Sequence, residues 1–562
     1  MKINLLKRSL AALLGATLLI SAAACGGGTT DNTTTAGGGG SDKPSESAGN
    51  EDEVLKIKIM GPDTTYGKFS MNEREDFAVW GELADLFAEF KLEPEFEVIA
   101  NEQYQTILQT RTATQTDLPD FLNVAALGDS SIIDMAMNGQ FKAINPIMEN
   151  HSDGTAKDFF ATEVGNRSWL LNTAEDGNVY WISQVQMTTY DDEPASTNYT
   201  VLVRGDWIAD LGLEYPTTAD EFYDVLKAFQ DNDMNDNGSK DEVLVADTAY
   251  FGNGIAQWFG LYYSLASFGI TDGTPTDITS PWYQEGIEEY FTFLQKLIAD
   301  GLMDATAVGA AQAGTQVENN KAAAIVSYPM ETWSMASVVG DDDALYVPLN
   351  LRGDADIQNS LIIEPPMLSY GRYAFTSEAT DDVANARLLD LLTSDKYIEL
   401  TAFGIEGETW EMKDGRKQLL PIAYHDAQEQ AYSEGKVIGD FLWGNGNMFP
   451  KRRFVPMENE MATVPDEQSD WQIANITYEV GTPMGSGNYL ALPTSDERET
   501  TSRLSTDLNS KSEEFATALT LGNRSIDDIP AMIAELEALG LKDFLAVDQG
   551  RMDRAIDLGM FN

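Results

Sequence analysis

The fold is decided by YTVLVRGDWIADLGLEYPTTADEF, residues 199–222. Its first part is rich in β-branched and apolar residues and predicts a strand that enters a turn. Its second part predicts the start of a helix, because Thr218 and Glu221 have the spacing of a capping box. One face of this helix then carries four apolar residues, Phe222, Val225, Leu226 and Phe229. The stretch therefore predicts a strand followed by an amphipathic helix.

The same succession of strand and helix occurs elsewhere in the chain. Apolar residues alternate with lysines over residues 55–59, which predicts a strand, and a further strand is expected near 96–98. Helical spacing follows each of them, over 80–87 and over 104–108. Later we expect a strand at 366–376 and helices at 382–392 and from 507 onward. Strands that alternate with helices are typical of an α/β fold with a partly parallel sheet.

A short acidic segment follows the helix and reads DMNDNGSKDE, residues 233–242. Oxygen-bearing side chains stand at alternate positions, and a glycine follows where an EF-hand-like loop turns sharply. Leu244 replaces the glutamate of the twelfth EF-hand position, and Glu242 is the residue available to complete the shell. The alternative is an acidic turn without an ion. We expect a structural Ca²⁺ held by Asp233, Asn235, Asn237, Ser239 through its carbonyl, Asp241 and Glu242.

The first 25 residues have the pattern of a secretory leader that ends in a modified cysteine. Basic residues precede an apolar run, LAALLGATLLISAAA, which is shorter than the roughly 20 residues of a membrane-spanning helix. Cys25 is the single cysteine, and AAAC, residues 22–25, resembles the bacterial lipobox with Ala in place of the usual Leu. We expect residues 1–24 to be a signal peptide and Cys25 to be lipidated. The alternative is a free thiol in a leader that is cut away.

The rest of the chain divides into a tether and a globular part. Residues 26–50 are mostly Gly, Thr, Ser, Asn and Asp, a composition that predicts a flexible tether after Cys25. Residues 51–562 are long enough for two or three domains with substantial cores.

Charge and histidine content exclude several classes of function. The chain has 91 Asp and Glu against 36 Lys and Arg, a net charge of −55, which repels nucleic acid phosphates. The need for solubility in a salt-containing extracellular medium explains this negative net charge. The two histidines, His151 and His425, are too few for a His-rich zinc site, and a Ser-His-Asp mechanism would depend on one of them.

Four segments together resemble the extracellular solute-binding lipoproteins of carbohydrate ABC importers, in the subgroup of the LipO type and the alginate-binding proteins. They span nearly the whole chain after the leader, in the order expected for this family. They are the lipobox with its tether, RGDWIADLGLEYPTTADEF (204–222) with DMNDNGSKDE after it, AFGIEGETWEM (402–412), and LGNRSIDDIPAMIAELEALGLKDFLAVDQGRMDR (521–554). The family's calcium loop uses the six ligand positions given above.

The resemblance implies an α/β fold of the periplasmic-binding-protein type, with two lobes, a strand hinge and a ligand cleft between the lobes. We expect the chain to cross between the lobes near 199–203 and near 369–375. The expected N-lobe is 51–200 plus about 366–425, and the expected C-lobe is 201–365 plus about 426–562.

The resemblance also implies a function without catalysis. The chain is expected to capture an oligosaccharide and deliver it to ABC permease subunits, as a lipid-anchored monomer on the extracytoplasmic face of the cell membrane. A peptide or another solute is an alternative ligand. An extracellular glycoside hydrolase, with two carboxylates about 5–10 Å apart, and a surface adhesin are alternative functions.

Sugar binding needs flat aromatic faces and planar polar groups. The chain has ten tryptophans, and any one of them is more often a core residue than a ligand platform. Flanking glycine, asparagine and other polar residues favour Trp333 and Trp443, followed by Trp258 and Trp282. The other candidate ligand residues are Arg372, Gln184 and Tyr66.

Membrane attachment is predicted to depend on the sulfur of Cys25. Each buried acyl CH₂ adds about 0.8 kcal/mol, so two or three chains hold the protein firmly. Cys25→Ser should release the protein or leave an uncleaved precursor, as measured by fractionation and by the mass of the chain. Normal processing and anchoring of this variant would disprove the lipoprotein assignment.

Overall fold

The computed structural model describes residues 52–63, 71–76, 79–187, 200–243, 254–262, 264–271, 274–304, 313–327, 339, 344–349, 351, 360–361, 367–413, 416–419, 449–450, 452–454, 482–485 and 489–561. Glu51–Asn562 form one compact unit. No helix in the described ranges is both long enough and apolar enough to cross a membrane.

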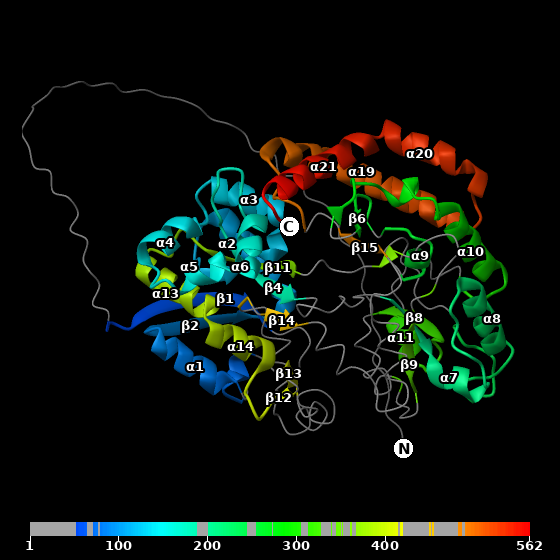
Figure 1. The fold of residues 1–562 in the computed structure, drawn as a ribbon, viewed down its shortest axis with the longest axis horizontal. Coiled ribbons are helices and arrows are strands. Elements are labelled where there is room, and N and C mark those ends of the chain that lie inside the picture. The colour runs from blue at the N-terminus through cyan, green and yellow to red at the C-terminus, as the bar shows by residue number, and fades with distance from the viewer. Residues whose placement is uncertain are drawn as a thin grey trace, which may run out of the picture. The chain divides into compact units, whose positions relative to one another are not determined.

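The first sheet has six strands in the order β14-β4-β11-β3-β1-β2 (Figure 1). Strand β1 is parallel to its neighbours β2 and β3, whereas β11 is antiparallel to β3 and β4. Pro94 lies in the edge strand β2, where its missing N–H is tolerated. The strands are β1 (Leu55–Pro62), β2 (Leu92–Ile99), β3 (Phe121–Asn123), β4 (Ile182–Met187), β11 (Met367–Phe375) and β14 (Arg452–Phe454).

Helices cover both faces of this sheet. Successive residues of β1 point to opposite faces, and β1 has buried apolar residues on each of them. Ile57 and Ile59 pack in one core cluster with residues of α1 and α13, and Met60 packs in another with residues of α2 and α3. We call this sheet and its helices the first lobe. The helices are α1 (Trp80–Glu89), α2 (Asn101–Thr114), α3 (Asp129–Met137), α4 (Ile144–His151), α5 (Thr155–Ala161), α6 (Glu163–Leu171), α13 (Asp382–Thr393) and α14 (Asp395–Phe403).

The second lobe contains two smaller sheets, ordered β8-β5-β9 and β10-β15-β6-β7. In the first of these, β5 is antiparallel to both of its neighbours. The strands are β5 (Thr200–Arg204), β6 (Phe268–Thr271), β7 (Thr274–Pro275), β8 (Ala324–Ser327), β9 (Tyr346–Leu349), β10 (Ser360–Leu361) and β15 (Thr482–Gly485). A separate two-stranded sheet pairs β12 (Trp410–Lys413) with β13 (Arg416–Leu419).

One large hydrophobic core joins the helices of the second lobe to the sheet around β5. The C-terminal helices contribute to this core and pack against one another and against α10 (Figure 1). The helices are α7 (Gly205–Asp210), α8 (Ala219–Gln230), α9 (Gly254–Trp258), α10 (Ile287–Ala299), α11 (Ala313–Glu318), α19 (Ser495–Thr520), α20 (Ile529–Ala538) and α21 (Leu541–Asp557).

The strand and helix predicted from residues 199–222 are confirmed as β5 and α8. All four apolar residues of the predicted helix face are buried. Thr218 caps α8 by accepting a hydrogen bond from the amide of Glu221 (3.2 Å). The other half of the predicted capping box differs, because the Glu221 carboxylate accepts from the amide (2.8 Å) and hydroxyl (2.7 Å) of Thr217 instead.

Two boundaries differ from those expected. The C-terminal helical region begins at Ser495 rather than near residue 507, because Thr494 and Glu497 form a reciprocal capping box there. Arg452–Phe454 lie beyond residue 425, where the second lobe was expected, and yet they form β14 beside β4 in the first sheet. The expected strand at 366–376 is confirmed as β11.

Gly286 is predicted to be required at the start of α10. A Cβ atom at this position would lie 1.9 Å from the carbonyl oxygen of Phe259, and backbone cannot yield as a flexible side chain does. Gly286→Ala should therefore lower the free energy of unfolding by about 1–3 kcal/mol. Gly81→Ala in α1 is the matched control, because no atom lies within 4 Å of the added methyl group and helix propensity favours Ala. Urea denaturation should show the two variants shifting stability in opposite directions; equal effects would refute the steric argument.

Candidate functional site

The acidic loop after α8 folds around the carboxylate of Asp233. One oxygen of this carboxylate accepts from the amide of Asn237 (3.2 Å), and the other accepts from the amide of Gly238 (2.8 Å). Gly238 has φ of +89°, a conformation that glycine adopts without strain. The sharp turn predicted at this glycine is therefore present.

Glu242 closes the loop from its other end. Its Oε1 accepts from the amides of Met234 (2.6 Å) and Asn235 (3.3 Å), which joins the end of the loop to its beginning. Asn237 lies across the loop, where its Nδ2 donates to Asp241 Oδ1 (2.8 Å) and its Oδ1 accepts from the amide of Ser239 (2.8 Å). All six predicted ligand residues thus take part in hydrogen bonds within the loop.

The loop is attached to the segment that leads into β8. Lys321 forms an ion pair with Asp241, and Asn235 donates to the carbonyl of Asn320 (3.0 Å). The hydrogen bonds from Lys321 and Asn237 hold the pKa of the Asp241 carboxyl below its usual range. The backbone amide of Val243, which directly follows the loop, donates to the carbonyl of Lys321 (2.8 Å). The position of the loop is therefore set by the sheet around β5.

The donor set fits a hard cation chemically. Its side chains offer carboxylate and amide oxygens, the ligands that Ca²⁺ takes. An ionised carboxylate has about four acceptor sites, so the amide bonds to Asp233 and Glu242 leave capacity for a cation. In the part of the chain that the structure describes, no three His, Cys, Asp or Glu side chains are grouped as a metal site. A cation here would depend on asparagine and backbone oxygens as well as carboxylates.

Two of the predicted polar ligand residues lie near each other in the first sheet. Gln184 in β4 is buried and pairs with Tyr370 of β11, two residues before Arg372. The guanidinium of Arg372 donates from Nε and Nη2 to the two carboxylate oxygens of Asp129 (both 2.9 Å) and lies 5.7 Å from the centre of the Trp181 ring. Arg372 is therefore held rigidly in a bidentate ion pair.

Asp129 and Trp181 were not predicted from the sequence. Asp129 lies 243 residues from Arg372 and reaches it only because β3 and β11 are neighbours in the sheet. Trp181 is fully buried, and its indole N–H donates to Asn172 Oδ1 (2.8 Å). No local pattern in the sequence indicates either contact.

The structure corrects two of the predicted sugar platforms. Trp258 and Trp282 are each only 1% exposed and belong to the core of the second lobe. Trp258 packs edge-on against Phe222, with 5.1 Å between ring centres. The indole of Trp282 donates to the hydroxyl of Ser512 (2.7 Å) and lies beside Phe291. Their faces are covered by protein and cannot receive a sugar ring.

The remaining predictions fall on residues that the structure does not describe. These are the lipidation site Cys25 and the predicted ligand contacts Tyr66, Trp333 and Trp443. The first expected hinge crossing, residues 199–203, falls on β5 (Thr200–Arg204) of the second lobe, and Tyr199 lies outside the described residues.

No protein-family model matches the sequence. The sequence is similar to one named lipoprotein and to two named binding proteins. It is 25% identical to lipoprotein LipO of Bacillus subtilis over 274 residues, which are 46% of this chain and 52% of the relative. It is 28% identical to the fructooligosaccharide ABC transporter substrate-binding protein FusA of Streptococcus pneumoniae over 202 residues, 34% of this chain and 35% of FusA. The polygalacturonan/rhamnogalacturonan-binding protein YtcQ of B. subtilis is 25% identical over 195 residues, 34% of each chain. The aligned regions thus span about half of LipO and a third of the other two.

Solved structures resemble the chain over most of its length. FusA in complex with kestose has a TM-score of 0.65 at 17% identity, covering 90% of this chain and 100% of FusA. The alginate-binding protein AlgQ2, solved without calcium ion, has a TM-score of 0.59 at 18% identity, covering 89% and 98%. A further FusA structure is of an EF-hand mutant. These likenesses confirm the predicted two-domain α/β fold, and the sequence similarities to LipO, FusA and YtcQ agree with the predicted family resemblance.

Proposed function

We propose that this chain is the extracytoplasmic solute-binding subunit of an ABC importer, which captures an oligosaccharide between two lobes and delivers it to membrane permease subunits. The observation that carries the proposal is the full-length similarity in fold to FusA, supported by the separate sequence similarity to FusA, LipO and YtcQ. The proposed anchor is a lipid on Cys25, which would hold the chain at the outer face of the membrane.

Capture in such a fold depends on lobe movement. A ligand that contacts both lobes binds the closed arrangement better, and it shifts the population towards that arrangement. The proposed lobes each have their own sheets and core, so they can move as rigid bodies. Gln184 and Arg372 are proposed as polar contacts on the first lobe, and the ion pair with Asp129 would hold Arg372 in position before the ligand arrives.

The chemistry of the chain favours a neutral oligosaccharide over an anionic one. A net charge of −55 repels uronate-containing sugars, and that repulsion must be offset locally before such a ligand binds. A neutral sugar of the fructooligosaccharide type avoids this cost. FusA, the relative named for such sugars, is also the most identical of the three relatives described above.

Ligand binding is predicted to close the lobes around a sugar stacked on Trp333 and Trp443. A panel of neutral and uronate oligosaccharides, with kestose included, should contain a ligand that raises the melting temperature without being hydrolysed. That ligand should lower the radius of gyration in small-angle scattering. Trp333→Ala and Trp443→Ala should each weaken binding by about 2 kcal/mol, or roughly 30-fold, because each removes a large buried contact.

The matched control is Trp282→Phe, which should lower stability without changing the affinity, because Trp282 lies in the core. Turnover of an oligosaccharide would favour the hydrolase alternative. Absence of any shift across the panel would favour the adhesin. A bound ligand that leaves the scattering profile unchanged would contradict lobe closure.

We also propose that the acidic loop holds a structural Ca²⁺ through Asp233, Asn235, Asn237, Ser239, Asp241 and Glu242. Bound there, the ion would offset two of the three negative charges of the carboxylates, which otherwise repel one another. The protein's own contribution is to place these oxygens: Gly238 turns the loop, and Asn320 and Lys321 fix it beside β8. Two of the similar structures support this proposal: AlgQ2 was solved without calcium ion, and one FusA structure is of an EF-hand mutant.

Chelation is predicted to lower the melting temperature, because an ion that binds only the native state stabilises it by mass action. Asp233→Asn combined with Asp241→Asn should abolish the sensitivity to chelator. Asp236→Asn is the matched control, since it removes a charge from the same loop at a position that is not a proposed ligand. Melting curves with calcium and with excess chelator test this; identical curves for the unmodified protein would contradict the calcium site.

A further inference from the structure

A short stretch of chain immediately before α19 contacts both lobes. Tyr489 and Leu490 pack in a cluster with Phe268 of β6 and Met552 of α21, on the second lobe. Leu492, two residues later, packs in a core cluster of the first lobe that includes Met60. Residues 489–494, which lie between β15 and α19 of the second lobe, therefore have side chains embedded in both lobes, and we call them the crossing segment.

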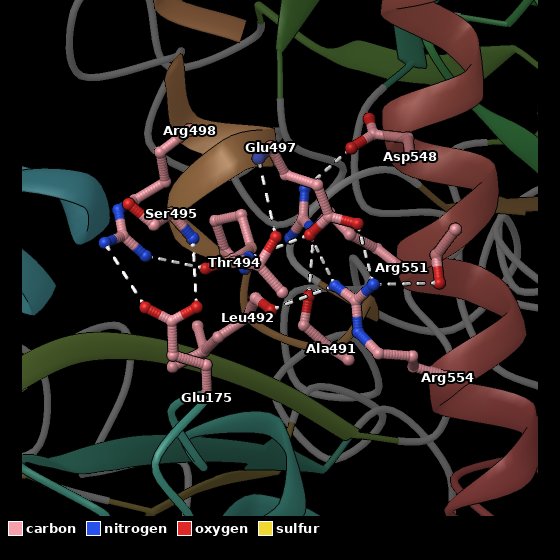
Figure 2. Close-up of polar contacts among 12 residues, drawn as sticks. Glu175, Ala491, Leu492, Thr494, Ser495, Glu497, Arg498, Asp548, Arg551 and Arg554 are labelled. Atoms are coloured by element: carbon pink, nitrogen blue, oxygen red, sulfur yellow. Dashed lines mark hydrogen bonds and ion pairs between the residues drawn. The ribbon is translucent and has the colours of Figure 1, made fainter. Parts of the chain in front are cut away.

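Three arginines hold the backbone of the crossing segment (Figure 2). The carbonyl of Ala491 accepts from Arg551 Nε (2.8 Å), that of Leu492 from Arg554 Nη2 (3.2 Å), and that of Pro493 from Arg498 Nη1 (2.9 Å). Buried carbonyls outside regular structure need donors, and guanidinium donors form charge-assisted hydrogen bonds. Three consecutive carbonyls are thus fixed by side chains from α19 and α21.

Arg498 also reaches the first lobe. Its Nη2 lies 2.9 Å from Asp134 Oδ1 in α3 and 3.8 Å from Glu175 Oε1. The second oxygen of Glu175 accepts from the amide of Ser495 (3.0 Å), at the first residue of α19, where the helix dipole favours a negative charge (Figure 2). The Arg498 side chain is only 8% exposed. One buried cation therefore connects the crossing segment to two carboxylates of the first lobe.

Glu497 fixes the start of α19 to α21. Its carboxylate forms a bidentate ion pair with Arg554 (2.7 and 2.6 Å) and accepts from the amide of Thr494 (2.8 Å). Burial alone would raise the pKa of Glu497, but the hydrogen bonds from Arg554 and Thr494 hold that pKa below its usual range. The carboxylate is ionised at neutral pH, and the segment before it cannot slide along α21 without breaking these bonds.

We infer that the crossing segment is a fixed pivot between the lobes and that Arg498 is its positioning residue. The inference rests on the two-lobe capture proposed above. It adds the segment that restricts the movement of one lobe relative to the other. A segment with side chains embedded in both lobes, three restrained carbonyls and a proline has little freedom to change its backbone conformation. Loss of the ion pairs of Arg498 with Asp134 and Glu175 weakens the polar attachment between α19 and the first lobe, although the hydrogen bond from the amide of Ser495 to Glu175 remains. The lobes then sample a wider range of relative orientations.

Distance measurements between spin labels test the pivot without any ligand, so their outcome is independent of whether the sugar has been identified. The whole chain is made with Cys25→Ser, which leaves no native cysteine, and with Glu149→Cys in α4 and Glu289→Cys in α10. Both positions are exposed, and they lie in different lobes. Double electron–electron resonance spectroscopy on the two spin labels then reports the distribution of distances between them.

We expect a narrow distribution for this parent and a broader one for Arg498→Gln. Arg498→Lys, which keeps the charge but loses the forked geometry, should lie between them. Asp134→Asn combined with Glu175→Gln removes the first-lobe partners from partly exposed positions, so it tests the pivot even if Arg498→Gln fails to fold. Arg524→Gln is the matched control, because its ion pair with Asp528 (3.0 Å) lies within the C-terminal helical region. Unchanged widths in the Asp134 and Glu175 double variant would overturn the pivot, whatever the ligand proves to be.

Discussion

Bidentate ion pairs between an arginine and a carboxylate join separate elements of this fold. A chain with 36 basic and 91 acidic residues has few cations to place, and the described structure puts several arginines where elements meet. The planar guanidinium suits these positions because it matches a carboxylate with two hydrogen bonds and still offers donors to backbone carbonyls. The pairs are Arg111 with Glu97, Arg204 with Asp206, Arg372 with Asp129, and Arg554 with Glu497.

The pair at the end of β5 connects the acidic loop to the core of the second lobe. Arg204 is 1% exposed, lies 4.2 Å from the centre of the Trp207 ring, and donates to the side chain of Asn320. The backbone carbonyl of the same Asn320 accepts from Asn235 in the loop. Asn320 therefore links the candidate calcium loop to β5, where the first hinge crossing was expected. The loop and β5 thus hydrogen-bond to the backbone and to the side chain of the same residue.

Local patterns were enough to predict the elements but not the contacts between them. The alternation at Ile57 and Ile59 and the helical face of α8 are properties of adjacent residues, and both predictions are confirmed. The start of α19 was missed because its first turns, SDERETTSR, are polar and have no apolar period. Trp258 and Trp282 were assigned to the ligand because glycine and polar residues flank them, yet their burial depends on partners as distant as Ser512. The partner of Arg372 could not be predicted either, since it follows from strand order alone.

A rigid pivot changes what a ligand must contribute to closure. If the lobes of the unbound protein sample many orientations, part of the binding free energy is lost in selecting one of them. A joint restrained by Arg498, Arg551 and Arg554 limits the movement to few degrees of freedom, so the ordering cost is met when the protein folds. Contacts to a sugar are individually modest, since stacking on an aromatic face adds on the order of 1 kcal/mol beyond burial. A solute-binding protein for oligosaccharides therefore gains affinity by restricting its own motion as well as by adding contacts.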